Sequence, residues 1–518
     1  MISVNNDFHK VANGQIIPLE AGLYVSFTKD IDDTLGWFVL DSSELDRDML
    51  ALDDKYTPMQ KWDYYEYIDF TDRLVSLDYE RSVEFPYNTQ SALADFTLDN
   101  YDDYFTPGSQ SAIDNYNVPG RPVKISCGFK GFGLLPQFVG ITRKMPTVEQ
   151  KSATASYHAV DFLSAIAEQS LTDIIDMREV RTDQVLAKIV QQFGVLPTQY
   201  RFDPGANIIP FVFFDVGQNA GEAIQKLVQA ENGKFWMDEM GMLRFTRRDF
   251  DTGAPVAVID DYSIINARSG SYSDIINHIV ISCDLREVQE FQTIYQKTPH
   301  GESADTNWVV PANSSITRKL TLEDPCYSVV TPTLGRASSV SWFTAIDSNM
   351  DEVNSDVAVV DEQLTNNSYI VTIQNDNNFA VEVDYLTLWG EPAKVYDHLD
   401  YEAYEDVSVD TYGDHRLTIA DNPFFQSYDQ AVAFADDIIN QRAFYNNIMT
   451  LDIKGDFSIQ LGDVIEIQGK YAGYWQIDSI KYYMEWGLLE TTIVVHSVPQ
   501  YSWFILDDDE LDGSKILG

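Results

Sequence analysis

The stretch "QSALADFTLDNYDDYFTPG", residues 90–108, changes character halfway along its length. Over 94–99, apolar and polar residues alternate, which is the period-two pattern of a strand with one buried face. The second half is acidic and aromatic, and it ends at Pro107 and Gly108. Because Pro and Gly favour turns, the stretch predicts a half-buried strand that runs into a structural turn.

The acidic second half also invites a calcium interpretation. An EF-hand loop requires oxygen ligands at its first, third and fifth positions and a glycine at its sixth. A loop that starts at Asp99 has Tyr104 at the sixth position, and one that starts at Asp95 has Asn100 there. The pattern therefore favours the strand and turn, and no metal site is predicted.

Length and composition set the scale of the fold. The chain has 518 residues, which predicts about three to four domains. At 44% hydrophobic residues it can bury a core in each of them. Its 29 Tyr and 28 Phe are typical of strands and of protein interfaces.

The charge is strongly negative. There are 81 Asp and Glu against 35 Lys and Arg, which gives a formal net charge of −46. Protein–DNA affinity comes largely from cations that neutralise phosphates, so such a chain is a poor nucleic-acid binder. It could still surround DNA without adhering to it. An acidic surface adapted to a salt-rich habitat is a second explanation, and the composition fits both.

The cysteines and the termini suggest a protein assembled in the cytosol. The sequence has three cysteines, Cys127, Cys283 and Cys326, and no CxxC motif. An odd number of widely spaced cysteines predicts neither a zinc site nor a disulfide framework. Each is expected to be a small buried residue. The N-terminus lacks the pattern of a signal peptide, and no apolar stretch is long enough to predict a membrane span.

Motifs for catalysis and cofactor binding are absent from the sequence. It contains no GxSxG, HExxH, P-loop or GxGxxG pattern. His158 and Asp161 are three residues apart in "SYHAVDF", but without a nucleophile we expect a structural hydrogen bond. No catalytic, cofactor-binding or metal-binding residue is therefore predicted, and the chain is not expected to be an enzyme.

The acid pair in "WMDEM", residues 236–240, is a candidate glycosidase site. Two carboxylates cleave a glycoside only across a sugar, with the pKa of one raised by an apolar pocket. The pair falls at the predicted tip of a hairpin, where we expect both carboxylates to be solvated. Sugar binding without cleavage remains an alternative for this acidic and aromatic chain.

Strands dominate the predicted elements, with helices in the middle and near the end. "IQLGDVIEIQG", residues 459–469, predicts a second structural turn, in which Gly462 supplies the turn or bulge geometry and Asp463 accepts turn N–H groups. Strands are expected at 22–27, 36–40, 73–85, 94–99, 122–129, 135–145, 152–162, 276–284, 367–395 and 449–498, helices at 161–171, 181–195, 219–233 and 427–446, and a hairpin at 234–249.

Taken in order, these segments resemble the tail-tip, or baseplate, hub proteins of tailed phages. The resemblance covers roughly residues 30–500 and depends on the order of the segments. It is carried by "FTDRLVSLDYERSVEFPYNTQSALADFTLDNYDDYFTPG" (70–108), "RPVKISCGF" to "PQFVGITRKMP" (121–146), "RTDQVLAKIVQQFGV" (181–195), "GEAIQKLVQAENGKFWMDEMGMLRFTRRD" (221–249), "VEVDYLTLWGEP" (381–392), "SVDTYGDHRLTIADNPFFQSYDQAVAFADDII" (408–439) and "IQLGDVIEIQGKYAGYWQIDSI" (459–480).

The resemblance implies an α+β, mostly β fold, with two tail-tube-like β-barrel domains plus smaller α/β domains. The implied domains are 1–165 for an N-terminal arm and the first tube-like β-barrel, 166–255 for a helix-plus-hairpin α/β domain, 256–420 for a second β domain with an irregular insertion at 285–350, 421–500 for a helix and C-terminal β block, and 501–518 for an acidic tail.

It also implies a structural role in the virion tail tip, with assembly in the host cytoplasm. A homotrimer would join a sixfold tail tube or distal tail ring to a threefold tip, and would line the channel for genome ejection. Implied partners are the distal tail protein or tube ring, the C-terminus of the tape measure protein, and a tip fibre, spike or receptor-binding protein. DNA would only pass through. No cofactor is implied.

Some relatives carry a long C-terminal extension with fibre or peptidoglycan-degrading modules. This sequence ends at Gly518, soon after the last predicted β block. A lytic or host-binding role is therefore not expected of this chain itself. The alternative function is a carbohydrate-binding or glycan-cleaving tail protein that contacts the host surface.

Overall fold

The computed structural model describes most of the chain, and strands predominate over helices, as predicted. The expected strand at 36–40 and the acidic tail at 501–518 lie outside the described residues. The described residues are 19–26, 67–83, 92–129, 133–248, 255–270, 274–297, 308–332, 342–365, 368–396, 399–444, 447–485 and 488–498.

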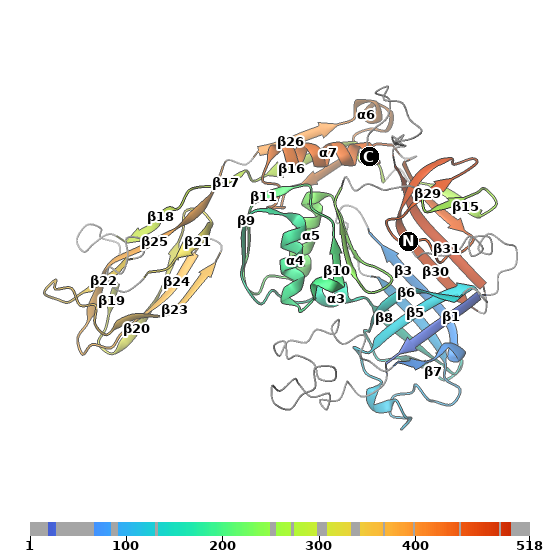
Figure 1. The fold of residues 1–518 in the computed structure, drawn as a ribbon, viewed down its shortest axis with the longest axis horizontal. Coiled ribbons are helices and arrows are strands. Elements are labelled where there is room, and N and C mark those ends of the chain that lie inside the picture. Colours follow the sequence, from blue (N-terminus) through green and yellow to red (C-terminus); the bar gives the residue numbers. More distant parts are fainter. Residues whose placement is uncertain are drawn as a thin grey trace, which may run out of the picture.

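Strands from both ends of the chain form one fourteen-stranded sheet, here called the joint sheet (Figure 1). Its N-terminal half contains β1 (Leu19–Val25), β2 (Ile68–Asp69), β3 (Leu74–Ser82), β4 (Leu93–Asp99), β5 (Pro122–Phe129), β6 (Gly133–Thr142), β7 (Thr147–Glu149) and β8 (Thr154–Val160). Its C-terminal half contains β14 (Ala257–Ile259), β15 (Ile264–Ser269), β28 (Ile448–Ile453), β29 (Val464–Ile467), β30 (Gly473–Glu485) and β31 (Leu488–Ser497).

The halves meet where β3 pairs with β30 in antiparallel register, with Tyr79 opposite Tyr482. The main path runs β15-β28-β31-β30-β3-β4-β8-β6-β5-β1-β2. Among the described strands this path is open, with an end at β15 and an end at β2. The two expected barrels are therefore not closed in the described structure. The physical reason is that β3 and β30 satisfy each other's edge groups, which merges the halves instead of closing each one.

The opening stretch of the sequence forms the predicted strand and turn. β4 spans Leu93–Asp99, and its apolar residues belong to the core of the joint sheet. After the strand, the side chain of Asn100 accepts a 2.8 Å hydrogen bond from the Phe105 N–H. Gly108 has a φ of +83°, and its N–H donates a 2.7 Å bond to Asp114. The predicted half-buried strand is confirmed.

A smaller α/β region follows, with two helices covering short strands. The predicted helices at 181–195 and 219–233 are found as α4 (Thr182–Gln192) and α5 (Ala220–Glu231). Asn219 caps α5 by accepting a 2.8 Å bond from the Glu222 N–H. The region also contains α3 (Phe162–Ala167), β9 (Ile175–Arg181), β10 (Tyr200–Phe202), β11 (Ile208–Phe214), β12 (Lys234–Met237) and β13 (Leu243–Thr246).

A third group of elements shares the core of the α/β region. The helix predicted at 427–446 is α7 (Tyr428–Arg442), and it contacts a three-stranded sheet in the order β26-β16-β27. That sheet is made of β16 (His278–Cys283), β26 (Leu399–Tyr404) and β27 (Arg416–Ile419), and the short helix α6 (Asp406–Tyr412) lies between β26 and β27.

Residues 286–395 form a β-sandwich, here called the inserted sandwich, which protrudes from the rest of the chain (Figure 1). Cys283 pairs with Leu399, so the chain leaves β16 and returns to β26 at adjacent points. One sheet contains β17 (Arg286–Val288), β18 (Gln292–Lys297), β19 (Trp308–Val310), β21 (Cys326–Val330), β22 (Trp342–Ile346) and β25 (Val381–Val395), and the other contains β20 (Ser314–Thr321), β23 (Val357–Thr365) and β24 (Ser368–Asn375).

The segment 285–350, expected to be irregular, contributes β17 to β22 to this sandwich. Its strands span three to eight residues, so the alternation within each one is brief. The sandwich has a core of its own, separate from those of the joint sheet and the α/β region. It therefore has the organisation of an independent domain placed within the β16–β26 pair.

Candidate functional site: the acidic face of the joint sheet

The two faces of the joint sheet differ in chemistry. One face carries the apolar core of the sheet, including Phe96, Tyr482 and Ile493. The opposite face, here called the acidic face, is polar because residues alternate along each strand. It carries Ser76, Asp78, Glu80, Asp95, Thr97, Asp99, Ser156, His158, Thr450, Asp452, Lys481, Tyr483, Glu485, Glu490 and Thr492.

The strand register places carboxylates of the acidic face next to one another. Asp78 lies directly opposite Asp95 across β3 and β4. Like charges in this position are destabilising in a sheet. On the other side of β3, Lys481 approaches Asp78 at 3.3 Å and Glu80 at 3.7 Å. Burial lowers the pKa of Lys481, but these carboxylates raise it more, so the net pKa lies above its ordinary value.

His158 belongs to this face, with a partner that the sequence did not predict. Its Nδ1 lies 2.5 Å from Asp95 Oδ1 on the neighbouring strand. Asp161 instead accepts from the Ala92 N–H at 2.7 Å and caps α3 through the Ser164 N–H at 3.1 Å. The expected pairing of His158 with Asp161 is wrong, because His158 lies on a strand rather than on a helical turn. Burial raises the pKa of Asp161 to about 7.

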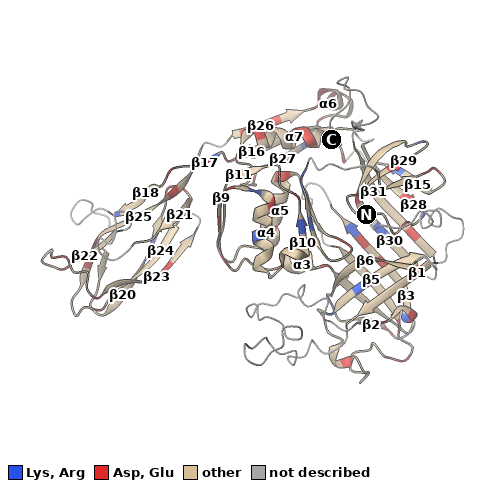
Figure 2. Cartoon of the chain, viewed as in Figure 1, with Lys and Arg blue, Asp and Glu red and all other residues tan. Residues whose placement is uncertain are grey.

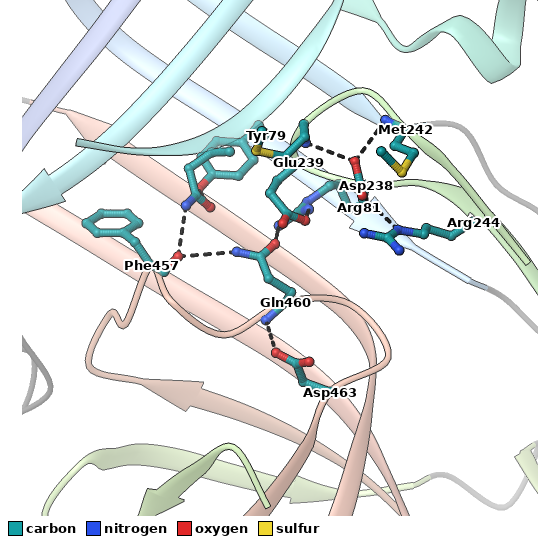
Figure 3. A network of polar contacts seen from close by, with 11 residues as sticks. Tyr79, Arg81, Asp238, Glu239, Met242, Arg244, Phe457, Gln460 and Asp463 are labelled. Carbon is teal, nitrogen blue, oxygen red and sulfur yellow. Dashed lines mark hydrogen bonds and ion pairs between the residues drawn. The ribbon is translucent and has the colours of Figure 1, made fainter. Parts of the chain in front are cut away.

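The β12–β13 hairpin lies against the joint sheet, which corrects the expectation that its two carboxylates are solvated (Figure 3). Asp238 is buried and accepts from the Met242 N–H at 2.8 Å and from Arg244 Nε at 2.8 Å. Glu239 lies 3.6 Å from the guanidinium of Arg81 on β3. Packing of the hairpin tip on the sheet therefore places both acids against arginine side chains of the protein instead of leaving them solvated.

Arg81 is the centre of a buried polar network, here called the polar junction (Figure 3). Only 2% of the Arg81 surface is exposed, and its guanidinium donates to the side-chain oxygen of Gln460. The Tyr79 hydroxyl donates a 2.9 Å bond to Gln137, whose amide donates at 2.8 Å to the carbonyl of Phe457. The network thereby connects β3, β6 and the 457–463 segment.

The predicted turn at Gly462 and Asp463 lies at one end of the polar junction. Gly462 has a φ of +82°, a conformation that L side chains rarely adopt. Its N–H donates to the Ile477 carbonyl at 2.9 Å. Asp463 accepts a 2.9 Å bond from the Gln460 N–H, and burial raises the pKa of Asp463 above its ordinary value.

A partly buried ion cluster connects the hairpin to the C-terminal strands. Asp478 on β30 binds Lys234 Nζ at 2.8 Å and His496 Nδ1 at 2.6 Å. Burial raises the pKa of Asp478. The charges of His496 and Lys234 lower it by a larger amount, so the net pKa is well below its usual range. Sequence motifs could not identify this cluster, because Lys234 is more than two hundred residues away from Asp478 in the chain.

Cys127, Cys283 and Cys326 are buried free thiols, as predicted. Within the described ranges, no three His, Cys, Asp or Glu side chains are arranged to hold a metal ion. In the same ranges, no helix has the length and apolarity to cross a membrane.

Comparison with solved structures finds similarity to several tail proteins at low sequence identity. They include the 43 kDa tail protein of prophage MuSo2 from Shewanella oneidensis (10% identity, TM-score 0.45, covering 83% of this chain and 96% of that one). A tail protein from Neisseria meningitidis MC58 gives 8% identity and a TM-score of 0.46, with coverage of 83% and 94%. Prophage tail protein gp18 from Listeria monocytogenes EGD-e gives 11% and 0.40, with coverage of 83% and 91%. No protein-family model and no curated protein matches the sequence.

Proposed function

We propose that this chain is a structural subunit of a virion tail-tip hub, in which a homotrimeric ring lines the DNA exit channel with the acidic face of the joint sheet. The observation that carries the proposal is the joint sheet itself, which has one acidic face and, among the described strands, two ends without a pairing partner. The order of sequence segments that resembles tail-tip hub proteins supports the same role.

The free ends provide a way to close a ring. Among the described strands, none pairs with the outer edge of β15. Near that edge, Tyr262 is 86% exposed, Ile265 is 68% exposed and Val258 is also exposed. An open edge with apolar neighbours favours pairing with another chain. Contact between the β15 end of one subunit and the β1–β2 end of the next would be head-to-tail, and such contacts can close into rings.

The acidic face suits passage of DNA. Carboxylates outnumber cations on such a wall, so binding of phosphates releases few counterions and DNA gains little by adhering. Screening limits the repulsion to about 8 Å at physiological salt, so residues that face the channel matter most. Acidic residues also occur in the other parts of the described chain (Figure 2). The acidic face differs in that the strand register places its carboxylates side by side.

Such a hub would contact a distal tail ring or tube, the end of the tape measure protein, and a fibre or spike. It would be assembled in the host cytoplasm and would have no enzymatic activity. A second candidate function, glycan binding, is favoured by one feature of the inserted sandwich. Phe291 is 41% exposed and stacks on Trp389 with ring centroids 6.1 Å apart, an aromatic surface that could contact a sugar ring.

Light scattering after size exclusion, with negative-stain imaging, tests the hub proposal directly. We expect a three-subunit ring with a central hole. Ile265→Asp places a charge at the free β15 edge and should shift the ring to monomers. The matched control is Val360→Asp at an exposed site of the inserted sandwich, which should leave the ring intact. A wild-type monomer, or a sixfold ring of this chain, would contradict the proposal.

A further inference from the structure

The inserted sandwich meets the rest of the chain at two chain crossings and at contacts that include an ion pair. Two chain crossings connect it, at Asp284–Leu285 and at Tyr396, and the Tyr396 N–H donates to the Leu285 carbonyl at 3.0 Å. Besides these crossings, β17 lies beside β11 and β21 lies beside β9. Polar contacts between domains with separate cores are typical of domains that move relative to each other.

The contact between β9 and β21 uses two alternate residues of β9. Arg178 forms an ion pair with Glu391 on β25, and its guanidinium lies 5.3 Å from the ring centroid of Tyr327. Asp176, two residues earlier, accepts a hydrogen bond from the backbone N–H of Ser328. Because residues i and i+2 of a strand share a face, both side chains reach toward the sandwich.

The backbone of β21 is shaped for this contact. Its pairing with β25 shifts register between Tyr327 and Val330, which is a β-bulge. Within the bulge, Ser328 has a φ of +51°. A bulge interrupts the ladder and redirects the groups of the extra residue. The Ser328 N–H is thereby directed to Asp176.

Asp176 is poorly accommodated as an anion. Its Oδ1 is buried and has no hydrogen-bond partner among the described residues. Burial is the largest cause that raises the pKa of Asp176; the Ser328 N–H opposes it and Glu391 adds to it, and the net pKa is about 7. A buried carboxylate without full hydrogen bonding is costly, and protonation removes that cost.

Other charged and titratable groups at the contact do not neutralise Asp176. Arg178 on β9 is engaged by Glu391. On the sandwich, Cys326 of β21 has a thiol whose pKa is raised to about 12 by burial, with added contributions from Asp324 and Asp176. The nearby acid Asp324 lies on the same side of the contact and adds negative charge.

We propose that Asp176, Arg178 and Glu391 form a proton-operated latch that holds the inserted sandwich against β9 when Asp176 is protonated and releases it when Asp176 is ionised. The sandwich then turns about the crossings at Asp284–Leu285 and Tyr396. The proposal is independent of the hub role, because it concerns two parts of one chain.

The sign of the pH dependence follows from linkage. The pKa of Asp176 is about 3.9 when exposed and about 7 when docked, so the docked state binds the proton more tightly. Docking is therefore strongest at low pH. It weakens by up to about tenfold in its equilibrium constant for each pH unit between those two values, and changes little above about pH 7.

The test measures the position of the sandwich in the full-length chain between pH 5 and pH 9. Dyes at Val216→Cys and Val360→Cys, both at exposed sites, report the distance by energy transfer, and small-angle X-ray scattering reports it without labels. We expect the docked fraction to fall as pH rises from 5 to 7. Asp176→Asn, which stays neutral, should remain docked throughout, and Glu179→Gln on the same strand is the matched control that keeps the wild-type response.

Arg178→Gln provides a second variant that does not alter Asp176. It should lower the docked fraction at every pH, because Glu391 loses its partner and Tyr327 loses the guanidinium. A wild-type sandwich that stays fixed from pH 5 to pH 9 would overturn the proposal. So would an Asp176→Asn variant that keeps the wild-type pH response.

Discussion

The guanidinium of Arg81 lies 3.6 Å from the carboxylate of Glu239, although the two residues belong to different parts of the fold. Arg81 is on β3 of the joint sheet, and Glu239 is at the tip of the β12–β13 hairpin. A buried guanidinium needs an acceptor or a counter-charge. This relationship gives the acidic hairpin tip a structural role, because its acid compensates a buried base of the neighbouring sheet.

Glu239→Gln should destabilise the protein by about 1–3 kcal/mol, because Arg81 keeps its buried charge and loses its counter-charge. Denaturant unfolding of the purified chain measures the effect. Glu323→Gln, at an exposed site of the inserted sandwich, is the matched control and should change the stability little. Equal stability of the two variants would show that Glu239 does not compensate Arg81.

Gly462→Val should destabilise the terminal strands and block assembly. The φ of +82° at this position is strained for a β-branched residue, at a cost of about 1–3 kcal/mol. Gly462→Asn is the informative comparison, because Asn tolerates left-handed backbone better than Val. Thermal unfolding and ring formation should rank wild type above Asn and Asn above Val. Normal assembly of the Val variant would contradict the prediction.

Asp478→Asn should remove part of the acid sensitivity of the fold. His496 and Lys234 outweigh burial and depress the pKa of Asp478 in the folded state. Its contribution to stability is therefore fully present above about pH 4, near the pKa of an unfolded aspartate, and is lost as pH falls below that value.

The measurement for Asp478 is the free energy of unfolding from pH 3 to pH 8. The difference between wild type and Asp478→Asn should be constant at neutral pH and should shrink below about pH 4. Asp361→Asn, at an exposed site on the inserted sandwich, controls for the general loss of acidic charge. A difference that does not change with pH would show that the ionised form of Asp478 is not favoured by folding.

Local patterns predicted local structure well. The alternation around Phe96, the helices α4 and α5 and the hairpin at 234–249 depend on neighbours in the chain, so their signals are visible in the sequence. The turn at Gly462 was also predictable, because its signal lies within a few neighbouring residues.

Long-range relationships were not predictable in this way. The partner of His158 is Asp95 on another strand, and Arg81 meets Gln460 and Glu239 from distant segments. Such contacts depend on strand register and domain packing, which no single window of sequence contains. The merging of two expected barrels into the joint sheet has the same cause.

The final prediction concerns the charge of the acidic face. Replacing Asp95 and Glu490 with Lys puts cations on two strands of this face. DNA should then bind the assembled ring, with an affinity that falls steeply as salt rises, because phosphates now release counterions. Particles that carry the variant should form normally and release their genome more slowly.

Asp361→Lys with Asp376→Lys is the matched control, because it makes the same change of charge on exposed residues of the inserted sandwich. Electrophoretic mobility of DNA with purified rings measures binding, and the rate of DNA release from particles measures passage. If the acidic face lines the channel, the Asp95 and Glu490 variant should slow release while the sandwich variant does not. Equal rates of DNA release in both variants would show that the acidic face does not act on DNA in the channel. They would favour an acidic surface adapted to a salt-rich habitat.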